Sequence, residues 1–141
     1  MPAITKELYK AEATVTGGRD GHGTTSDGLL DLDLKVPVAM GGPGGGTNPE
    51  QLFAIGYAAC FQSAMGVVSR RRKLDTSAST ITAAVTIGTI SGGSFGLAVA
   101  LKVALPGIEP GTAREILEEA DVVCPYSNAT RGNIEVTLSL V

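Results

Sequence analysis

Charged and aromatic residues are scarce in this chain. Charged residues make up 18% of the 141 residues, whereas they account for roughly 25% of a typical soluble domain. Only three Tyr and three Phe are present, and the formal net charge is −3. Nucleic-acid binders need a basic surface and stacking rings, so we expect no nucleic-acid partner. The low charged fraction also indicates hidden surface, as in a subunit interface.

Long uninterrupted apolar runs are also missing. No stretch reaches the roughly 18 apolar residues of a membrane-spanning helix. The most apolar segment, residues 52–68, is interrupted by Cys60, Gln62 and Ser63, which predicts a buried helix and no membrane partner. The first ten residues mix Lys and Glu with single apolar residues, unlike a signal peptide. We therefore expect a cytoplasmic protein, and the length suits a single domain spanning residues 1–141.

Apolar residues alternate with polar or small residues in several segments, which is typical of half-buried strands. The predicted strands cover residues 8–16, 30–36, 80–87, 97–105 and 134–140. Turn-forming residues 17–23 are expected to form a hairpin loop that presents Arg19. The predicted order is βββαββαβ, an α+β fold with mostly antiparallel sheet around a long, central, buried helix.

That long helix is the clearest predicted element. Thr47 or Asn48 is expected as its N-cap and Pro49 as its first helical residue. The cationic run 70–73 suits its C-terminal end. Apolar residues cover almost its whole circumference, so the helix needs cover on all sides. A second, short helix is predicted to begin at Thr112.

The two cysteines are the first indication of function. Cys60 lies in the apolar helix, where it is either a reactive thiol or a small hydrophobe filling the core. Cys124 precedes Pro125 at a turn, which favours an exposed, reactive thiol. A peroxide-reducing cysteine needs a nearby cation and a second thiol to convert its sulfenic acid into a disulfide. Arg19 and Cys124 are candidates for these two parts, although Arg19 or Glu50 taken alone would be an ordinary surface residue.

Other motifs indicate neither a nucleotide nor a metal. The glycine-rich segment 41–46 precedes a helix, but no Gly-Lys-Ser/Thr follows it. Cys60, Cys124 and His22, the one histidine, lack the spacing of a zinc site. We therefore expect no metal and no bound cofactor.

Two segments, residues 46–61 and 123–133, closely resemble the organic hydroperoxide resistance proteins (Ohr) of the OsmC-like superfamily. Matches also occur at residues 16–21, 26–28 and 96–99, so the resemblance extends over essentially the whole chain. The segment beginning at Cys124 is similar to the Ohr branch rather than to its sister branch, OsmC.

The resemblance implies roles for four residues. Cys60 would be the peroxidatic cysteine and Cys124 the resolving cysteine. Arg19 would hold the Cys60 thiolate and polarise the bound peroxide, while Glu50 would orient Arg19. His22 matches no catalytic role in the family.

The resemblance further implies a thiol-dependent peroxidase that reduces alkyl and lipid hydroperoxides to alcohols in oxidative-stress defence. Its electron donor would be a lipoylated protein, with a dithiol such as dihydrolipoamide as external reductant. It would be an intertwined homodimer with two central helices wrapped by sheets. The apolar residues beside Cys60, Phe53, Tyr57 and Phe61, predict a preference for peroxides with a hydrocarbon body. The alternative function is a non-enzymatic, peroxide-responsive redox sensor that acts through protein contacts.

Overall fold

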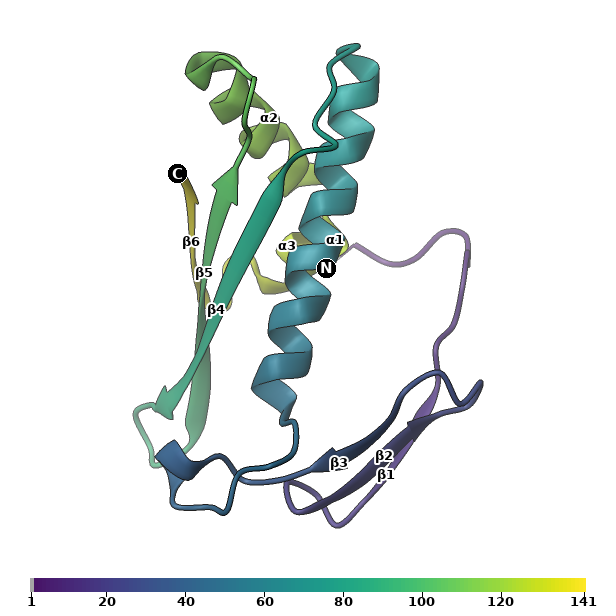
Figure 1. Cartoon of the computed structure of the whole chain (residues 1–141), viewed down its shortest axis with the longest axis vertical. Helices are drawn as coiled ribbons and strands as arrows, with labels where there is room; N and C mark the ends of the chain where they lie inside the picture. The colour runs from purple at the N-terminus through teal and green to yellow at the C-terminus, as the bar shows by residue number, and fades with distance from the viewer. Residues whose placement is uncertain (1) are drawn as a thin grey trace. The chain divides into compact units, whose positions relative to one another are not determined.

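A computed structural model describes residues 2–141 as an α+β fold, as predicted, with two compact units, Met1–Pro49 and Glu50–Val141 (Figure 1). We call them the N-terminal and C-terminal units and describe each by itself. That the whole chain forms one domain stays a prediction.

The N-terminal unit is a three-stranded antiparallel sheet in the order β1-β2-β3. Its strands are β1 (Ala13–Thr16), β2 (Gly21–Thr25) and β3 (Asp31–Leu34), followed by the 3₁₀ helix η1 (Val38–Met40). The third N-terminal strand of the predicted order is therefore β2, which begins inside the expected loop 17–23. Sequence periodicity missed β2 because its residues, Gly-His-Gly-Thr-Thr, bury no alternating apolar side chains. Backbone pairing with β1 on one side and β3 on the other holds it in place.

This N-terminal sheet has almost no core of its own. Leu34 is the one buried apolar residue among the described residues of the unit. Its large exposed apolar residues are Ile4, Leu8, Tyr9, Val15, Leu29, Leu30, Val38 and Met40. A small sheet needs a covered apolar face to be stable, so this unit requires cover from elsewhere.

The C-terminal unit combines three helices with a second three-stranded sheet. Its elements are α1 (Pro49–Arg71), β4 (Thr80–Thr89), β5 (Phe95–Ala104), α2 (Pro110–Val123), α3 (Pro125–Thr130) and β6 (Glu135–Leu140). The sheet order is β4-β5-β6, in which β5 pairs antiparallel with β4 and parallel with β6. The parallel pairing follows from the helical connection through α2 and α3, since a short hairpin cannot join parallel strands.

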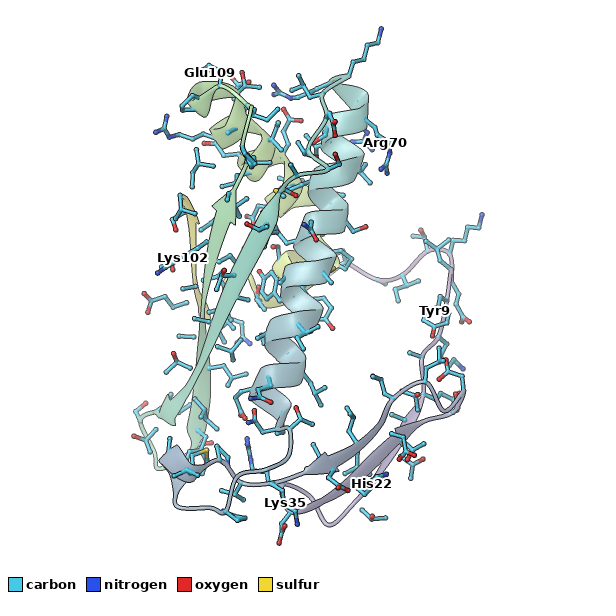
Figure 2. All side chains as sticks on the ribbon, in the orientation of Figure 1. Tyr9, His22, Lys35, Arg70, Lys102 and Glu109 are labelled. Carbon is cyan, nitrogen blue, oxygen red and sulfur yellow. The ribbon has the colours of Figure 1, made fainter. Side chains whose placement is uncertain are left out.

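One face of this second sheet forms the main core. Val99, Leu101 and Val103 of β5 are buried on it, and they belong to one apolar cluster with side chains of α1 and α2. The opposite face carries polar residues and alanines, and Lys102 extends from it away from α1 (Figure 2). The alternation predicted for these strands is therefore confirmed.

Helix α1 begins at Pro49, as predicted, and has one buried face. Its buried apolar residues are Tyr57, Phe61, Ala64, Met65 and Val68. Leu52 and Ile55 are exposed in the single chain, Ile55 to 70%. By length and composition alone α1 could cross a membrane, but its buried face makes it a core helix of this fold.

Two helical features differ from the sequence prediction. Helix α2 begins at Pro110, not Thr112, because the Glu109 carboxylate accepts hydrogen bonds from the backbone N–H groups of Gly111 and Thr112. Helix α3 was not predicted, since its six residues are too few to show a helical period.

Candidate active site

The structure brings the two cysteines together although they are 64 residues apart in the chain. Cys60 lies in the middle of α1, and Cys124 connects α2 to α3. Both are free thiols, and the Cys124 Sγ donates to the Cys60 Sγ at a distance of 3.6 Å. Closure to a disulfide requires the sulfurs to approach to about 2.05 Å, which is a small movement.

The two thiols differ in accessibility. Cys124 is fully buried, whereas Cys60 is partly exposed. The expectation that Cys124 is an exposed turn cysteine is therefore wrong, because the turn between α2 and α3 packs into the core. A solvent-borne oxidant reaches Cys60 first.

The surroundings of Cys60 within the C-terminal unit favour the neutral thiol on balance. Burial raises the pKa of Cys60, and the neighbouring Cys124 thiol raises it further. A hydrogen bond from the backbone N–H of Tyr126 acts in the opposite direction and lowers that pKa, but it does not offset the burial.

Three aromatic rings form a cluster around Tyr57, which lies one helical turn before Cys60. The ring centroids of Phe53, Tyr57 and Tyr126 lie 5.6 to 5.9 Å apart. A side chain at Gly56 would place its Cβ 2.9 Å from the Tyr126 hydroxyl oxygen, so only glycine lets Tyr126 pack this closely on α1. Phe53 and Tyr126 keep exposed surface, so apolar ring surface lies within about two helical turns of Cys60.

Sequence reasoning selected a partly different set of aromatic residues. Phe61 and Tyr57 are fully buried in the core, so neither ring is open to a substrate. Tyr126 was missed because nothing in the local pattern brings it to α1. The one feature of the sequence that could have indicated Tyr126 is its position two residues after Cys124.

A buried network of three hydroxyl groups connects α1 to α3 next to the cysteine pair. The Tyr57 hydroxyl lies 3.0 Å from the Ser127 Oγ and 3.1 Å from the Thr130 Oγ1. All three residues are buried, so breaking any of these bonds leaves a polar group without water. Sequence analysis did not single out Ser127 or Thr130.

Arg19 lies in a tight turn of the N-terminal unit between β1 and β2. Gly17 and Gly18 have φ values of +76° and +58°, which favour glycine, and the Asp20 N–H donates to the Gly17 carbonyl. The Asp20 carboxylate pairs with the Lys35 ammonium at 2.9 Å, which ties this turn to the end of β3. The hydrogen bond and the ion pair thus hold the backbone of the turn that carries Arg19.

Glu50 lies in the first turn of α1, in the C-terminal unit. The catalytic roles of Arg19 and Glu50 stay predictions, as does the assignment of Cys60 and Cys124 as peroxidatic and resolving cysteines.

His22 is held between two carboxylates on the exposed surface of the N-terminal sheet (Figure 2). Its Nδ1 lies 2.9 Å from the Asp33 Oδ1, and its Nε2 contacts Asp31. Hydrogen bonds with Asp33 and Asp31 raise the pKa of His22. Across residues 2–141, no group of three or more His, Cys, Asp or Glu side chains is arranged to hold a metal ion.

The family model described as "OsmC-like protein" matches residues 42–139, and the chain belongs to this family. An organic hydroperoxide resistance protein from Xanthomonas axonopodis pv. citri is 51% identical over 142 residues, covering 99% of both chains. The organic hydroperoxide resistance protein OhrB of Bacillus subtilis is 41% identical and covers 94% of this chain and 98% of its own. The resemblance stated from the sequence is thereby confirmed.

Solved structures show the same fold. An organic hydroperoxide resistance protein from Legionella pneumophila superposes with a TM-score of 0.92 at 47% identity, covering 96% of this chain and 98% of its own. A putative member from Vibrio cholerae, with captopril bound in one of its active sites, gives a TM-score of 0.94 at 46% identity, covering 98% and 95%.

Proposed function

We propose that this chain is a thiol peroxidase that reduces organic hydroperoxides to alcohols in oxidative-stress defence. The observation that carries the proposal is the pair of free thiols 3.6 Å apart, one partly exposed and the other buried behind it. The names of the relatives at up to 51% identity support the same substrate class.

The proposed reaction has three balanced steps. The Cys60 thiolate attacks the distal oxygen of the hydroperoxide, and the released alkoxide takes up a proton and leaves as the alcohol. The Cys124 thiol then attacks the resulting Cys60 sulfenic acid, which forms the Cys60–Cys124 disulfide and releases water. A dithiol reduces this disulfide through a mixed disulfide and is itself oxidised to a cyclic disulfide.

The apolar neighbourhood of Cys60 supports organic substrates and a lipoyl reductant. Phe53 and Tyr126 offer partly exposed ring surface against Tyr57, which lies one helical turn before the thiol, and burial of each substrate CH₂ group contributes roughly 0.8 kcal/mol. Dihydrolipoamide combines a hydrocarbon arm with two thiols, so a lipoylated protein is the proposed electron donor. The proposed location is the cytoplasm, because the first ten residues do not resemble a signal peptide.

Steady-state kinetics with hydrogen peroxide, tert-butyl hydroperoxide and cumene hydroperoxide test this function, with dihydrolipoamide as the reductant. We expect kcat/KM to rise along that series, by roughly two to four orders of magnitude in total, because each successive peroxide has a larger hydrocarbon group and buries more apolar surface. Phe53→Ala should reduce the preference, whereas Phe95→Ala, which removes an exposed ring on β5, should not.

Equal rates with hydrogen peroxide and cumene hydroperoxide would contradict the apolar site. Efficient turnover with glutathione alone would contradict the lipoyl donor. A single oxidation event without turnover, in the presence of either reductant, would favour the redox sensor over the enzyme.

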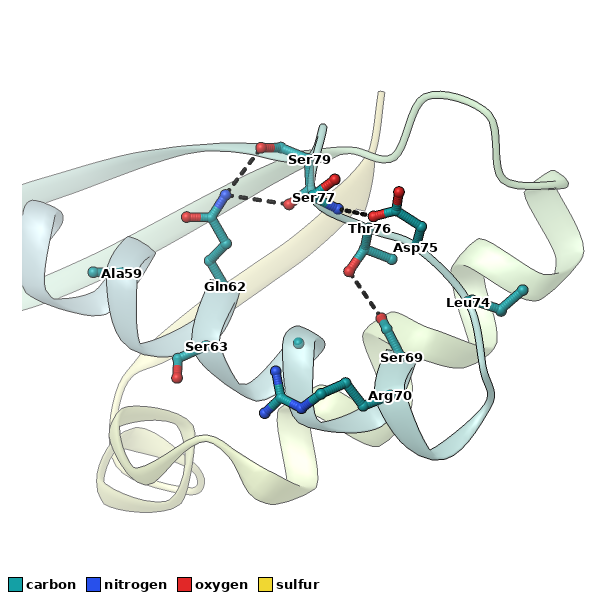
Figure 3. Close-up of a pocket in the computed structure, with 11 residues that line it drawn as sticks. Ala59, Gln62, Ser63, Ser69, Arg70, Leu74, Asp75, Thr76, Ser77 and Ser79 are labelled. Atoms are coloured by element: carbon teal, nitrogen blue, oxygen red, sulfur yellow. Dashed lines mark hydrogen bonds between the residues drawn. The ribbon is translucent and has the colours of Figure 1, made fainter.

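We also propose that the chain functions as a homodimer in which a second copy covers α1. Leu52, Ile55 and Ala59 are exposed along one side of α1, and a hollow of about 570 Å³ lies at the C-terminal part of that side (Figure 3). Ser63 and Gly66 line the hollow, and across it the Gln62 side chain donates to the Ser79 carbonyl oxygen (Figure 3). Exposed apolar surface of this size on a helix is typical of a protein–protein interface.

Sedimentation velocity at micromolar concentration should give twice the mass of one chain. Ile55→Glu should weaken the dimer, because it places a charge in the apolar contact. Val122→Glu adds the same charge at an equally exposed residue of α2, 69% against 70%, and should leave the dimer intact. A folded, stable monomer in the wild type would contradict the proposal.

A further inference from the structure

The three buried hydroxyl groups form a chain with a defined direction. The Thr130 hydroxyl donates to the Tyr126 carbonyl oxygen at 2.9 Å. A hydroxyl has a single proton to donate, so Thr130 must accept at its contact with Tyr57. The Tyr57 hydroxyl therefore donates to Thr130 and accepts from Ser127. The chain runs from Ser127 through Tyr57 and Thr130 to the backbone of Tyr126.

Its end point links the chain to the thiol pair. The Tyr126 carbonyl receives the last hydrogen bond, and the backbone N–H of the same residue lowers the pKa of the Cys60 thiol. Cys124 lies two residues earlier, at the beginning of α3. Tyr57 lies three residues before Cys60, about one turn along the same face of α1. The hydroxyl chain thus fastens the segment carrying Cys124 onto α1 one turn from Cys60.

We propose that Tyr57, Ser127 and Thr130 are positioning residues that hold Cys124 and the Tyr126 N–H against Cys60, and so determine how often oxidised Cys60 closes to a disulfide. This inference rests on the function proposed above and adds three residues to it.

Two reactions compete for the Cys60 sulfenic acid. Attack by the Cys124 thiol forms the disulfide and releases water, whereas attack on a second hydroperoxide forms the sulfinic acid and releases an alcohol. The first reaction depends on the 3.6 Å approach of the sulfurs, and the second does not. Loosening α3 therefore shifts the outcome toward over-oxidation.

Thr130→Val and Thr130→Ser form a matched pair of variants, because valine keeps the shape and loses the hydroxyl while serine keeps the hydroxyl. The measurement is the fraction of Cys60 converted to sulfinic acid per turnover, by mass spectrometry, during dihydrolipoamide-driven reduction of cumene hydroperoxide. We expect about a tenfold rise in Thr130→Val, which removes the hydrogen bonds of Thr130 with Tyr57 and with the Tyr126 carbonyl oxygen, and a value near the wild type in Thr130→Ser. Tyr57→Phe should behave like Thr130→Val, whereas Tyr9→Phe, which removes an exposed hydroxyl, should have no effect.

A second readout separates positioning from a loss of stability. The Cys60 thiolate, titrated by its absorbance at 240 nm, should have a higher pKa in Thr130→Val and Tyr57→Phe, since the Tyr126 N–H is less well placed. An unchanged over-oxidation fraction and an unchanged titration in both folded variants would overturn the inference. If the wild type itself does not turn over cumene hydroperoxide, the proposed function fails instead, and the titration still tests the positioning.

Discussion

Replacing Cys60 with serine is expected to lower kcat/KM for organic hydroperoxides by roughly a thousandfold or more, as removal of an enzyme's nucleophile does. Cys60 is the partly exposed member of the thiol pair, and the serine hydroxyl is far too weak an acid to replace a thiolate.

Replacing Cys124 with serine has a different expected outcome. The first peroxide is reduced, and Cys60 then accumulates as sulfinic acid because no buried thiol closes the disulfide.

Single-turnover and multiple-turnover assays of the two variants separate these outcomes, with the double serine variant as background. Mass spectrometry identifies the oxidised species on Cys60. Sustained turnover by Cys60→Ser with a dithiol would refute the assignment of Cys60. Sustained turnover by Cys124→Ser at the wild-type rate would show that the reductant, and not Cys124, resolves the sulfenic acid.

Replacing Arg19 with alanine is the second change with a large expected effect. Burial and the Cys124 thiol raise the pKa of Cys60, and the Tyr126 N–H does not offset them. A thiolate at neutral pH therefore needs a cation, and we expect Arg19 to supply it. An opposite charge at close range lowers a pKa by about 1 to 3 units, so its loss should reduce the thiolate fraction and kcat/KM by about 10-fold to 1000-fold.

The thiolate titration and kcat/KM should be measured together across pH. For Arg19→Ala the rate should recover as pH rises through the increased pKa, because the deficit lies in deprotonation. Arg19→Lys keeps the charge without the planar guanidinium, so its Cys60 pKa and its kcat/KM should lie between those of the wild type and of Arg19→Ala. Arg114→Ala removes an exposed charge from α2 and should change neither quantity. An unchanged titration in Arg19→Ala would show that another group activates Cys60.

Features with a strong local cause could be predicted from the sequence. Helix α1 begins at Pro49 because the residues before it favour a helix start and proline suits the first turn. Strands β4 and β5 follow the apolar alternation, since one face of their sheet is buried and the other is not. The family resemblance rested on short segments around Cys60 and Cys124, and it held over the whole chain.

Features that depend on packing could not be predicted in this way. Strand β2 has no apolar pattern and exists through pairing with both neighbours. Cys124 was expected to be exposed because it precedes a proline at a turn, but the fold buries that turn. Arg72, in the cationic run that suits the end of α1, pairs with Glu115 and Glu119 of α2, a contact that no local pattern indicates.

By itself the sequence determined the family, the order of the main elements and the two candidate thiols. Only the tertiary structure decided that these thiols lie 3.6 Å apart, that Cys60 is the accessible one, and that Tyr57, Ser127 and Thr130 lie behind them. The physical reason is separation along the chain. Helical and strand periods act over a few residues, whereas Tyr57 and Thr130 are 73 residues apart and meet only because α1 and α3 share one core.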